Sequence, residues 1–184
     1  MIEYENEKKF MLNCEQYTEL LNKLGDYSKK TEQINYYYDT PDEEFRGGGI
    51  TCRIRQKDDL LIGTVKQHEA GGDGSVEKHF KLGSLPYKMT VDNRQVALIG
   101  QLITFRTECK LSDSMTLMLD KNIYLGTVDY ELELEYQKQN EAEATRYIDE
   151  LINSLGGIGK VTISQSKSER FYKKLHCVEE LDSI

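Results

Sequence analysis

Acidic and basic side chains recur at alternate positions in several short stretches of the sequence. Glu131 and Glu133 alternate with apolar residues in the run VDYELELEY, and Arg53 and Arg55 do so in ITCRIR. Residues two apart point to the same side of a β-strand. Paired carboxylates suit a hard divalent cation such as Mg²⁺ or Mn²⁺, and guanidinium groups bind phosphate oxygens bidentately. The two patterns together predict a site for a metal-bound polyphosphate.

The charged side of any one strand has a simpler explanation, because one face of most antiparallel sheets faces water. For a single strand that explanation is the favoured one. It is harder to apply to the whole set, since the apolar sides must also pack somewhere. If helices cover the apolar sides from outside, the charged sides point into a barrel, and about eight strands enclose room for one small ligand. Buried charges of both signs then need one another, bound ions or water.

The elements that must position these residues follow from hydrophobic periodicity. Period-two alternation predicts about eight strands, at residues 3–12, 33–39, 50–55, 60–67, 75–82, 102–111, 114–120 and 128–136. Helical spacing predicts helices at 13–24, with Asn13 as N-cap and Gly25 as the stop, and at 92–98, 147–155 and 166–175. Because most strands come as consecutive hairpins, the predicted fold is α+β, a closed antiparallel β-barrel (a tunnel) with helices packed outside.

Length and composition narrow the functional classes. The chain has 184 residues, which predicts a single domain over residues 1–184. Its formal charge of -8 argues against general nucleic-acid binding, so an anionic ligand must meet a local basic cluster. Four cysteines without a C-x-x-C pair suggest neither a zinc site nor a dense disulfide framework. No stretch has the apolar length of a membrane span or signal region, so we expect a cytoplasmic protein with no membrane partner. The acidic charge is compatible with a homodimer without requiring one.

Motifs in the first half of the sequence resemble those of the CYTH superfamily, the triphosphate tunnel metalloenzymes. Glu5-Asn6-Glu7-Lys8-Lys9 resembles the E-x-E-x-K signature that opens the family. Tyr37-Tyr38-Asp39-Thr40 resembles its Y-Y-D-T segment, Arg53-Ile54-Arg55 its R-x-R strand and Thr64-Val65-Lys66 its T-x-K strand. These motifs occur in the family's order.

The second half of the sequence continues the resemblance. Arg106 resembles the lone strand arginine, Asp120 the aspartate after an apolar strand, and Glu131-Leu132-Glu133 the late E-x-E pair. Lys167 resembles the lysine near the C-terminus. The resemblance therefore covers nearly the whole chain. The superfamily includes thiamine triphosphatases, inorganic tripolyphosphatases and class IV adenylyl cyclases.

The resemblance implies roles for the matched residues. One or two Mg²⁺ or Mn²⁺ ions are expected to bind the acidic residues Glu5, Glu7, Glu131 and Glu133, assisted by Asp120. The triphosphate is expected to bind the basic residues Arg53, Arg55, Lys66, Arg106 and Lys167. Lys9 either neutralises charge or orients an attacking water, and the expected catalytic residues are Lys9, Glu7 and Arg55.

Some of these assignments have competitors. Four acids alternate from Asp129 to Glu135, and the family pattern favours Glu131 and Glu133 as the ligands. Arg170 competes with Lys167 for the late basic role. Glu77 is a further acid that either lines the tunnel or faces solvent.

The sequence leaves three functions open. Hydrolysis of a compact triphosphate, such as inorganic tripolyphosphate or thiamine triphosphate, is preferred because no nucleobase-recognition motif is visible. The alternative is a class IV adenylyl cyclase, which converts ATP to cyclic AMP and pyrophosphate with the same metals and basic residues. The third is a non-catalytic polyphosphate-binding protein.

Overall fold

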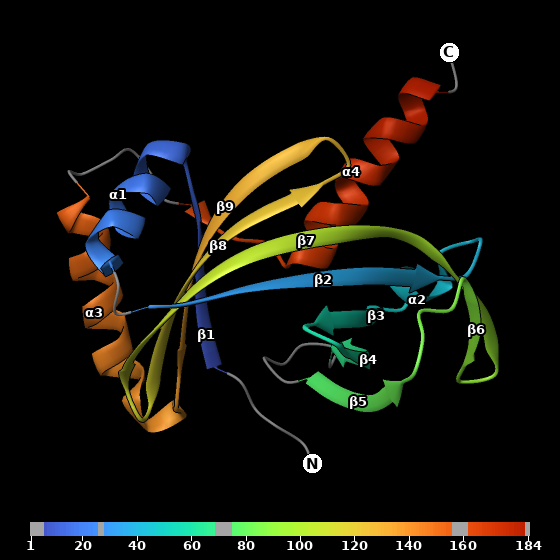
Figure 1. Ribbon diagram of the computed structural model, residues 1–184, viewed down its shortest axis with the longest axis horizontal. Helices are drawn as coiled ribbons and strands as arrows, with labels where there is room; N and C mark the ends of the chain where they lie inside the picture. Colours follow the sequence, from blue (N-terminus) through green and yellow to red (C-terminus); the bar gives the residue numbers. More distant parts are fainter. Residues whose placement is uncertain (1–5, 26–27, 69–74, 156–161, 183–184) are drawn as a thin grey trace. The chain divides into compact units, whose positions relative to one another are not determined.

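The computed structural model describes residues 6–25, 28–68, 75–155 and 162–182 (Figure 1). The strands are β1 (Asn6–Leu12), β2 (Lys29–Asp39), β3 (Ile50–Lys57), β4 (Leu60–His68), β5 (Ser75–Leu82), β6 (Lys88–Val91), β7 (Arg94–Ser112), β8 (Met115–Tyr124), β9 (Thr127–Tyr136) and β10 (Thr162–Ile163). The helices are α1 (Cys14–Leu24), α2 (Glu44–Gly47), α3 (Glu141–Ser154) and α4 (Lys167–Asp182), with a 3₁₀ turn, η2 (Lys138–Asn140), before α3. No helix in the described part of the chain is both long and apolar enough to cross a membrane.

The chain forms two compact units. The described residues of unit 1 lie within Glu32–Ile103 and Phe171–Ile184, and those of unit 2 within Glu5–Thr31 and Thr104–Arg170. In unit 2 the strand order is β10-β1-β9-β8-β7, and in unit 1 it is β7-β2-β3-β4-β5, with β6 on β7. β1 pairs antiparallel with β10 and β9, β8 with β9, and β4 with β3 and β5.

The α+β class is confirmed, but the antiparallel sheet has ten strands rather than about eight. The prediction of a closed barrel is wrong. The order is an open path that ends at β10 and β5, and within the described ranges no pairing joins these two strands. Alternation predicts which side chains share a face, but it does not decide whether a sheet closes.

The segment around residues 92–98, predicted as a helix, is instead the hairpin between β6 and β7. Asp92 and Asn93 have positive φ angles of 44° and 63°, and they connect Val91 to Arg94, which pair with each other. Two central residues with positive φ form the turn that matches the twist of a hairpin, and Asp and Asn tolerate this conformation. The Asp92-Asn93 dipeptide therefore indicates a turn. Strand β7 begins directly after it and is 19 residues long.

Helix α1 has the ends that the sequence predicts. Asn13 Oδ1 accepts the backbone N–H of Gln16 at 2.9 Å, and the Asn13 N–H donates to Gln16 Oε1 at 2.7 Å. This reciprocal pair satisfies backbone donors that the start of a helix leaves open. The helix ends at Gly25, whose φ of +53° is strained for residues with a side chain.

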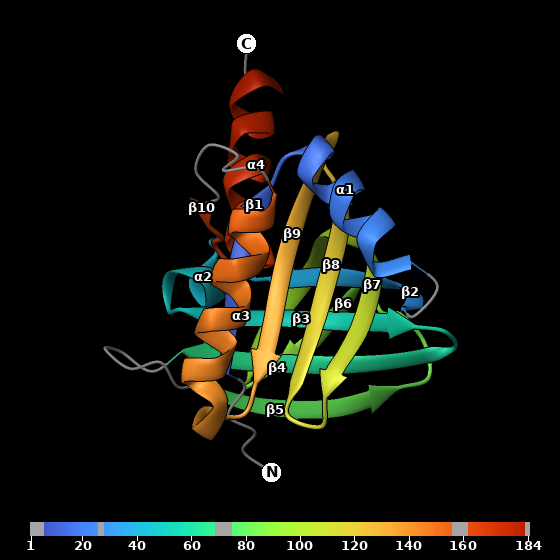
Figure 2. The same cartoon turned by 90° about the vertical axis from the view of Figure 1, so that its left-hand side faces the viewer.

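Helices α1 and α3 cover the apolar side of the unit 2 sheet (Figure 2). The buried cluster that they form with the sheet contains Leu20, Leu117, Leu132, Leu134 and Ile148. On β9 its leucines alternate with Glu131 and Glu133. Burial of the leucines therefore directs these two glutamates to the opposite, polar side of the sheet.

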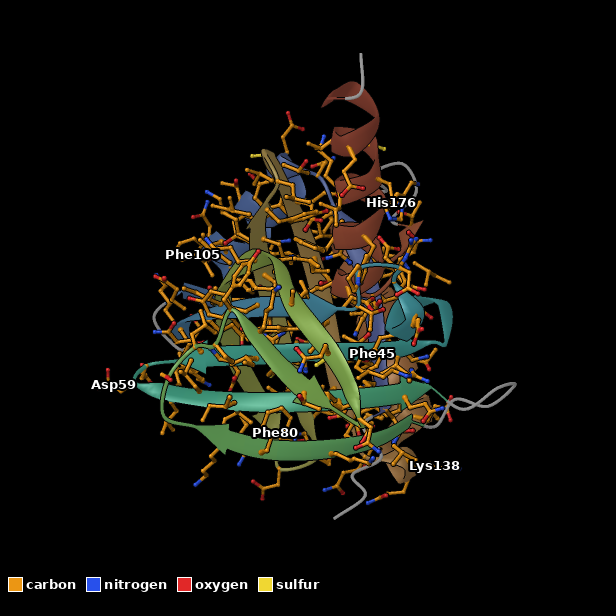
Figure 3. All side chains as sticks on the ribbon, turned by 90° about the vertical axis from the view of Figure 1, so that its right-hand side faces the viewer. Phe45, Asp59, Phe80, Phe105, Lys138 and His176 are labelled. Atoms are coloured by element: carbon orange, nitrogen blue, oxygen red, sulfur yellow. The ribbon has the colours of Figure 1, made fainter. Side chains whose placement is uncertain are left out.

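The apolar core of unit 1 lies on one side of β2 to β5. It contains Tyr38, Phe45, Cys52, Ile54, Val65 and Phe80. Phe45 comes from α2 and Phe80 from β5 (Figure 3). The Phe80 ring lies over Gly63, its partner across the β4–β5 pair, where an added Cβ would lie 2.2 Å from the ring. This close approach explains a glycine in the middle of β4.

Asp39, at the end of β2, holds α2 and α4 in unit 1. Its carboxylate accepts the backbone N–H groups of Phe45 and Arg46 at 3.0 and 3.1 Å and the Tyr172 hydroxyl at 2.7 Å. Burial and the hydrogen bond to Asp39 raise the pKa of Tyr172. The aspartate of the Y-Y-D-T segment therefore stabilises the fold of this unit.

Candidate functional site

Three buried carboxylates meet on the polar side of the unit 2 sheet. Asp120 on β8 lies directly across from Glu131 on β9, and Glu133 follows two residues later on β9. Asp120 and Glu131 are 0% exposed, and Glu133 is 3% exposed. One oxygen from each of the three lies within 4.8 Å of the other two. We call these three residues the acidic cluster.

Two basic side chains contact the acidic cluster directly. Arg106 of β7 donates to Asp120 from Nε at 2.8 Å and from Nη2 at 2.7 Å, and Nη2 also lies 2.6 Å from Glu133. Lys167 at the start of α4 places Nζ 2.9 Å from Asp120 and 2.5 Å from Glu133. Lys167 Nζ also donates to Glu131. A single ammonium group thus contacts all three carboxylates.

Burial and charge act in opposite directions on these groups. Burial alone would lower the pKa of Lys167, but the charges of the acidic cluster outweigh it and raise that pKa. Burial would raise the pKa of Glu133, but the charges of Lys167 and Arg106 hold it well below its ordinary value. Lys167 and Glu133 are therefore both charged at neutral pH.

Arg170, in the first turn of α4, contacts the cluster from another direction. Its Nη1 and Nη2 each lie 3.1 Å from an oxygen of Glu131, and its Nε donates to Asp129 at 3.0 Å. Asp129 also accepts from Asn122 Nδ2 at 2.8 Å and from the Tyr124 hydroxyl at 2.7 Å. Because these protein donors occupy its oxygens, Asp129 is poorly suited to bind a metal.

A second group of carboxylates shares Glu133 with the acidic cluster and is less buried. Glu7 of β1 lies across from Glu135 of β9, and one oxygen from each lies within 4.8 Å of one from Glu133. The Glu7 side chain is 29% exposed and lies 2.7 Å from Lys9 Nζ. Glu5, the other acid of the first motif, lies outside the described residues. We call Glu7, Glu133 and Glu135 the open acidic group.

The open acidic group fits a divalent cation by its donors. Mg²⁺ and Mn²⁺ prefer oxygen ligands, and Mg²⁺ retains several waters, which a partly exposed site can supply. In the acidic cluster Arg106, Lys167 and Arg170 contact all three carboxylates, whereas in the open acidic group Arg106 and Lys167 contact Glu133. A metal bound to the open acidic group would therefore take an oxygen of Glu133 from one of these two basic side chains.

The other predicted phosphate-binding residues lie in unit 1. The strand register places them on the side of β2 to β5 that is opposite the apolar core. We call this side the basic face; its arginines and lysines are Arg53, Arg55, Lys57, Lys66 and Lys81. Glu77 of β5 also lies here, 2.9 Å from Lys66 Nζ. Burial would raise the pKa of Glu77, but the hydrogen bond and charge of Lys66, with the charge of Arg53, lower it.

Within unit 2 the structure brings together most of the predicted acids and three of the predicted basic residues. Arg106 and Lys167, expected to bind phosphate, are ion-paired to carboxylates. The sequence prediction missed Ser164, whose hydroxyl donates to Glu131 at 2.7 Å, because a lone serine outside a periodic segment gives no signal. Glu135 and Arg170 were competitors of the predicted site residues. For Arg170 the signal was its i,i+3 spacing from Lys167 on one helix face.

Similarity to known proteins extends over most of the chain. The model of the CYTH domain family matches residues 3–172. "Putative triphosphatase YjbK" of Bacillus subtilis is 29% identical over 150 residues, which cover 72% of this chain and 77% of that protein. The structure of a "putative adenylate cyclase" from Bacillus halodurans has a TM-score of 0.73 and 25% identity, over 92% of this chain and 98% of that one. "Putative adenylyl cyclase HpAC1" from Hippeastrum shares the fold, with a TM-score of 0.75 and 18% identity, over 92% and 95%.

Proposed function

Because the chain belongs to the CYTH family, we propose that it is a metal-dependent triphosphatase that hydrolyses inorganic tripolyphosphate or thiamine triphosphate. The name of the Bacillus subtilis relative, at 29% identity, supports this class of reaction. The observation that carries the proposal is the meeting of carboxylates from β1, β8 and β9 in two groups that could hold a metal ion. We also propose that residues 1–184 act as one catalytic domain.

The open acidic group is the proposed metal site. Glu7, Glu133 and Glu135 would hold Mg²⁺ or Mn²⁺ through carboxylate oxygens. A bound metal would supply charge neutralisation for phosphate oxygens and activation of water. Asp120 and Glu131 lie next to this group and keep Lys167 and the arginines in position around it.

The basic face is the proposed site for the phosphate chain. Arg53 and Arg55 present guanidinium groups, which can bind two phosphate oxygens at once, and Lys66 adds a point charge. Arg55 is oriented by Asn35, whose Oδ1 accepts from Arg55 Nε at 3.0 Å. Loss of Arg53, Arg55 or Lys66 is therefore expected to weaken substrate binding.

Arg106 and Lys167 have a first role in holding Glu133 charged and the acidic cluster ordered. Direct contact of either residue with triphosphate requires that it exchange a carboxylate partner for a phosphate oxygen. Lys9 lies 2.7 Å from Glu7, and we propose that it orients this carboxylate and, through it, the attacking water.

A second candidate is cyclisation of ATP, with the ribose hydroxyl in place of water as nucleophile. The similarity to the Bacillus halodurans structure, at 25% identity, supports cyclisation as the alternative. Both reactions need the same metal and phosphate contacts, so the products must separate them.

The test is product analysis with purified protein. The protein is incubated with Mg²⁺ or Mn²⁺ and with tripolyphosphate, thiamine triphosphate or ATP, and phosphate, pyrophosphate and cyclic AMP are measured. Phosphate from a small triphosphate supports the proposal, whereas cyclic AMP with pyrophosphate supports the cyclase. Tight binding without any product would overturn both.

Two variants and a control locate the activity. Glu7→Gln and Arg55→Ala should abolish turnover without unfolding the protein. Glu150→Gln, an acid-to-amide change on the exposed surface of α3, should leave it intact. Full activity in both site variants would contradict the assignment.

A further inference from the structure

Two side-chain amides on β2 are buried without a hydrogen-bond acceptor. Gln33 is 5% exposed and Asn35 is 0% exposed. In the part of the chain that the structure describes, no protein group accepts a hydrogen bond from Gln33 Nε2 or Asn35 Nδ2. A buried donor without an acceptor carries the desolvation cost of its polar group, so native proteins seldom keep one without a use.

The strand register places both amides on the basic face. Asn35 lies across from Arg55, and Gln33 lies across from Lys57. Ile34 and Tyr36, the residues between and after them, point to the other side, where Tyr36 packs against the apolar core of unit 1. The two orphan donors therefore belong to the same surface as the five arginines and lysines.

The orientation of the Asn35 amide is set by its neighbour. Arg55 Nε donates to Asn35 Oδ1 at 3.0 Å, so the oxygen faces Arg55 and the NH₂ group faces away from it. Arg55 cannot accept a hydrogen bond, so the reverse orientation would lose this contact. The Asn35 NH₂ group is consequently available as a donor on the side away from Arg55.

These donors match one class of ligand. The non-bridging oxygens of a phosphate chain are acceptors only and carry negative charge, which suits amide N–H groups beside arginine and lysine. A metal cation would need oxygen atoms instead of N–H groups.

We propose that Gln33 and Asn35 are substrate-binding residues that donate hydrogen bonds from Nε2 and Nδ2 to non-bridging oxygens of the phosphate chain. This inference rests on the proposed function for the identity of the ligand. It adds two uncharged residues to a site that the sequence motifs describe by arginine and lysine alone.

The test uses tripolyphosphate binding and thermal stability of the full chain. Gln33→Met keeps the size of the side chain, adds no charge and removes the donor. Because hydrogen bonds to charged groups are stronger than neutral ones, we expect the Kd for tripolyphosphate, measured by calorimetry in EDTA, to rise by about 10-fold to 100-fold. The melting temperature should stay the same or rise, since an orphan donor is replaced by an apolar group.

A matched control and a second variant complete the test. Gln56→Met is the same substitution on the opposite side of β3, where Gln56 Oε1 accepts from the Tyr36 hydroxyl at 3.0 Å. It should leave the Kd unchanged and lower the melting temperature. Asn35→Asp keeps the acceptor for Arg55 but replaces the donor by an anion, and should weaken binding more than Gln33→Met.

The outcomes separate the inference from the proposed function. If wild-type protein binds tripolyphosphate but releases no phosphate, the triphosphatase proposal fails, and weaker binding by Gln33→Met still supports the inference. If wild-type protein hydrolyses tripolyphosphate and Gln33→Met binds it equally well, the inference is overturned and the function stands. If wild-type protein does not bind tripolyphosphate in EDTA, the inference is overturned, and if it also releases no phosphate with Mn²⁺, the proposed function is overturned as well.

Discussion

Lys167 is the cation that all three carboxylates of the acidic cluster contact, so its loss tests how the cluster is stabilised. Lys167→Met keeps the length of the side chain and removes its charge, while Arg106 and Arg170 remain. The Lys167 side chain is 10% exposed, so the carboxylates have little access to water as a substitute. Breaking a buried ion pair by removing one partner costs about 3–5 kcal/mol. We expect the free energy of unfolding to fall by this amount, with a melting temperature lower by about 6–20 °C.

The pH dependence of this loss has a definite sign. The pKa of Glu133 is lowered in the folded wild-type protein, so its contribution to stability is present above its ordinary pKa of 4.5 and is lost as the pH falls through the folded value. Without Lys167 this lowering is smaller, so the variant loses less stability on acidification. The difference between wild type and variant should be largest at neutral pH and should shrink below about pH 4.5.

The assay is urea unfolding in EDTA, followed by circular dichroism at neutral and acidic pH. Lys23→Met is the control, because its ion pair with Glu19 is exposed at 2.8 Å and such pairs contribute about 0.5 kcal/mol or less. If the free energy of unfolding of Lys167→Met at neutral pH were within about 1 kcal/mol of the wild-type value, the stabilising role of the buried Lys167 ion pairs would be refuted. If the stability difference between wild type and Lys167→Met grew as the pH was lowered, the predicted pH dependence would be refuted.

Other predictions concern single hydrogen bonds and Arg106, which contacts the acidic cluster. Tyr172→Phe should lower the free energy of unfolding by about 1–3 kcal/mol, because it removes a donor to buried Asp39; an unchanged urea midpoint would contradict this. Asn13→Ala should lower it by about 1 kcal/mol through loss of the α1 cap, whereas Asn13→Ser should be close to wild type. Arg106→Lys retains the charge but cannot keep both hydrogen bonds to Asp120, so the rate of phosphate release should fall at least about 10-fold. A wild-type rate would show that the paired hydrogen bonds from Arg106 to Asp120 are dispensable.

Several features of the fold were predictable because they depend on local sequence. Alternation in VDYELELEY placed Glu131 and Glu133 on one side of β9, and Leu132 and Leu134, which alternate with them, are in the core. The α1 cap at Asn13 and the stop at Gly25 were predictable for the same reason, since caps act over a few residues. The closed barrel and the helix at 92–98 were wrong predictions, because closure of a sheet is a long-range property and the β6–β7 hairpin depends on Asp92 and Asn93 adopting positive φ.

The site was predictable in its residue types more than in its pairings. Periodicity placed Glu131 and Glu133 on one face, and the family resemblance selected Asp120. Neither could show that Lys167 and Arg106 contact carboxylates, since ion-pair partners depend on which strands are neighbours. The buried amides of Gln33 and Asn35 lie at alternate positions of β2, which the sequence displays. Their missing acceptors are visible only when every neighbour is placed.

The claim that carboxylates of β1 and β9 hold the catalytic metal is tested most directly by the metal dependence of turnover. The measurement is the initial rate of phosphate release from tripolyphosphate as Mn²⁺ is titrated into metal-free protein. Glu135→Gln should raise the Mn²⁺ concentration for half-maximal rate by at least about 10-fold relative to wild type and to the surface control Glu150→Gln. Identical Mn²⁺ curves for the three proteins, or full activity in EDTA, would contradict the account.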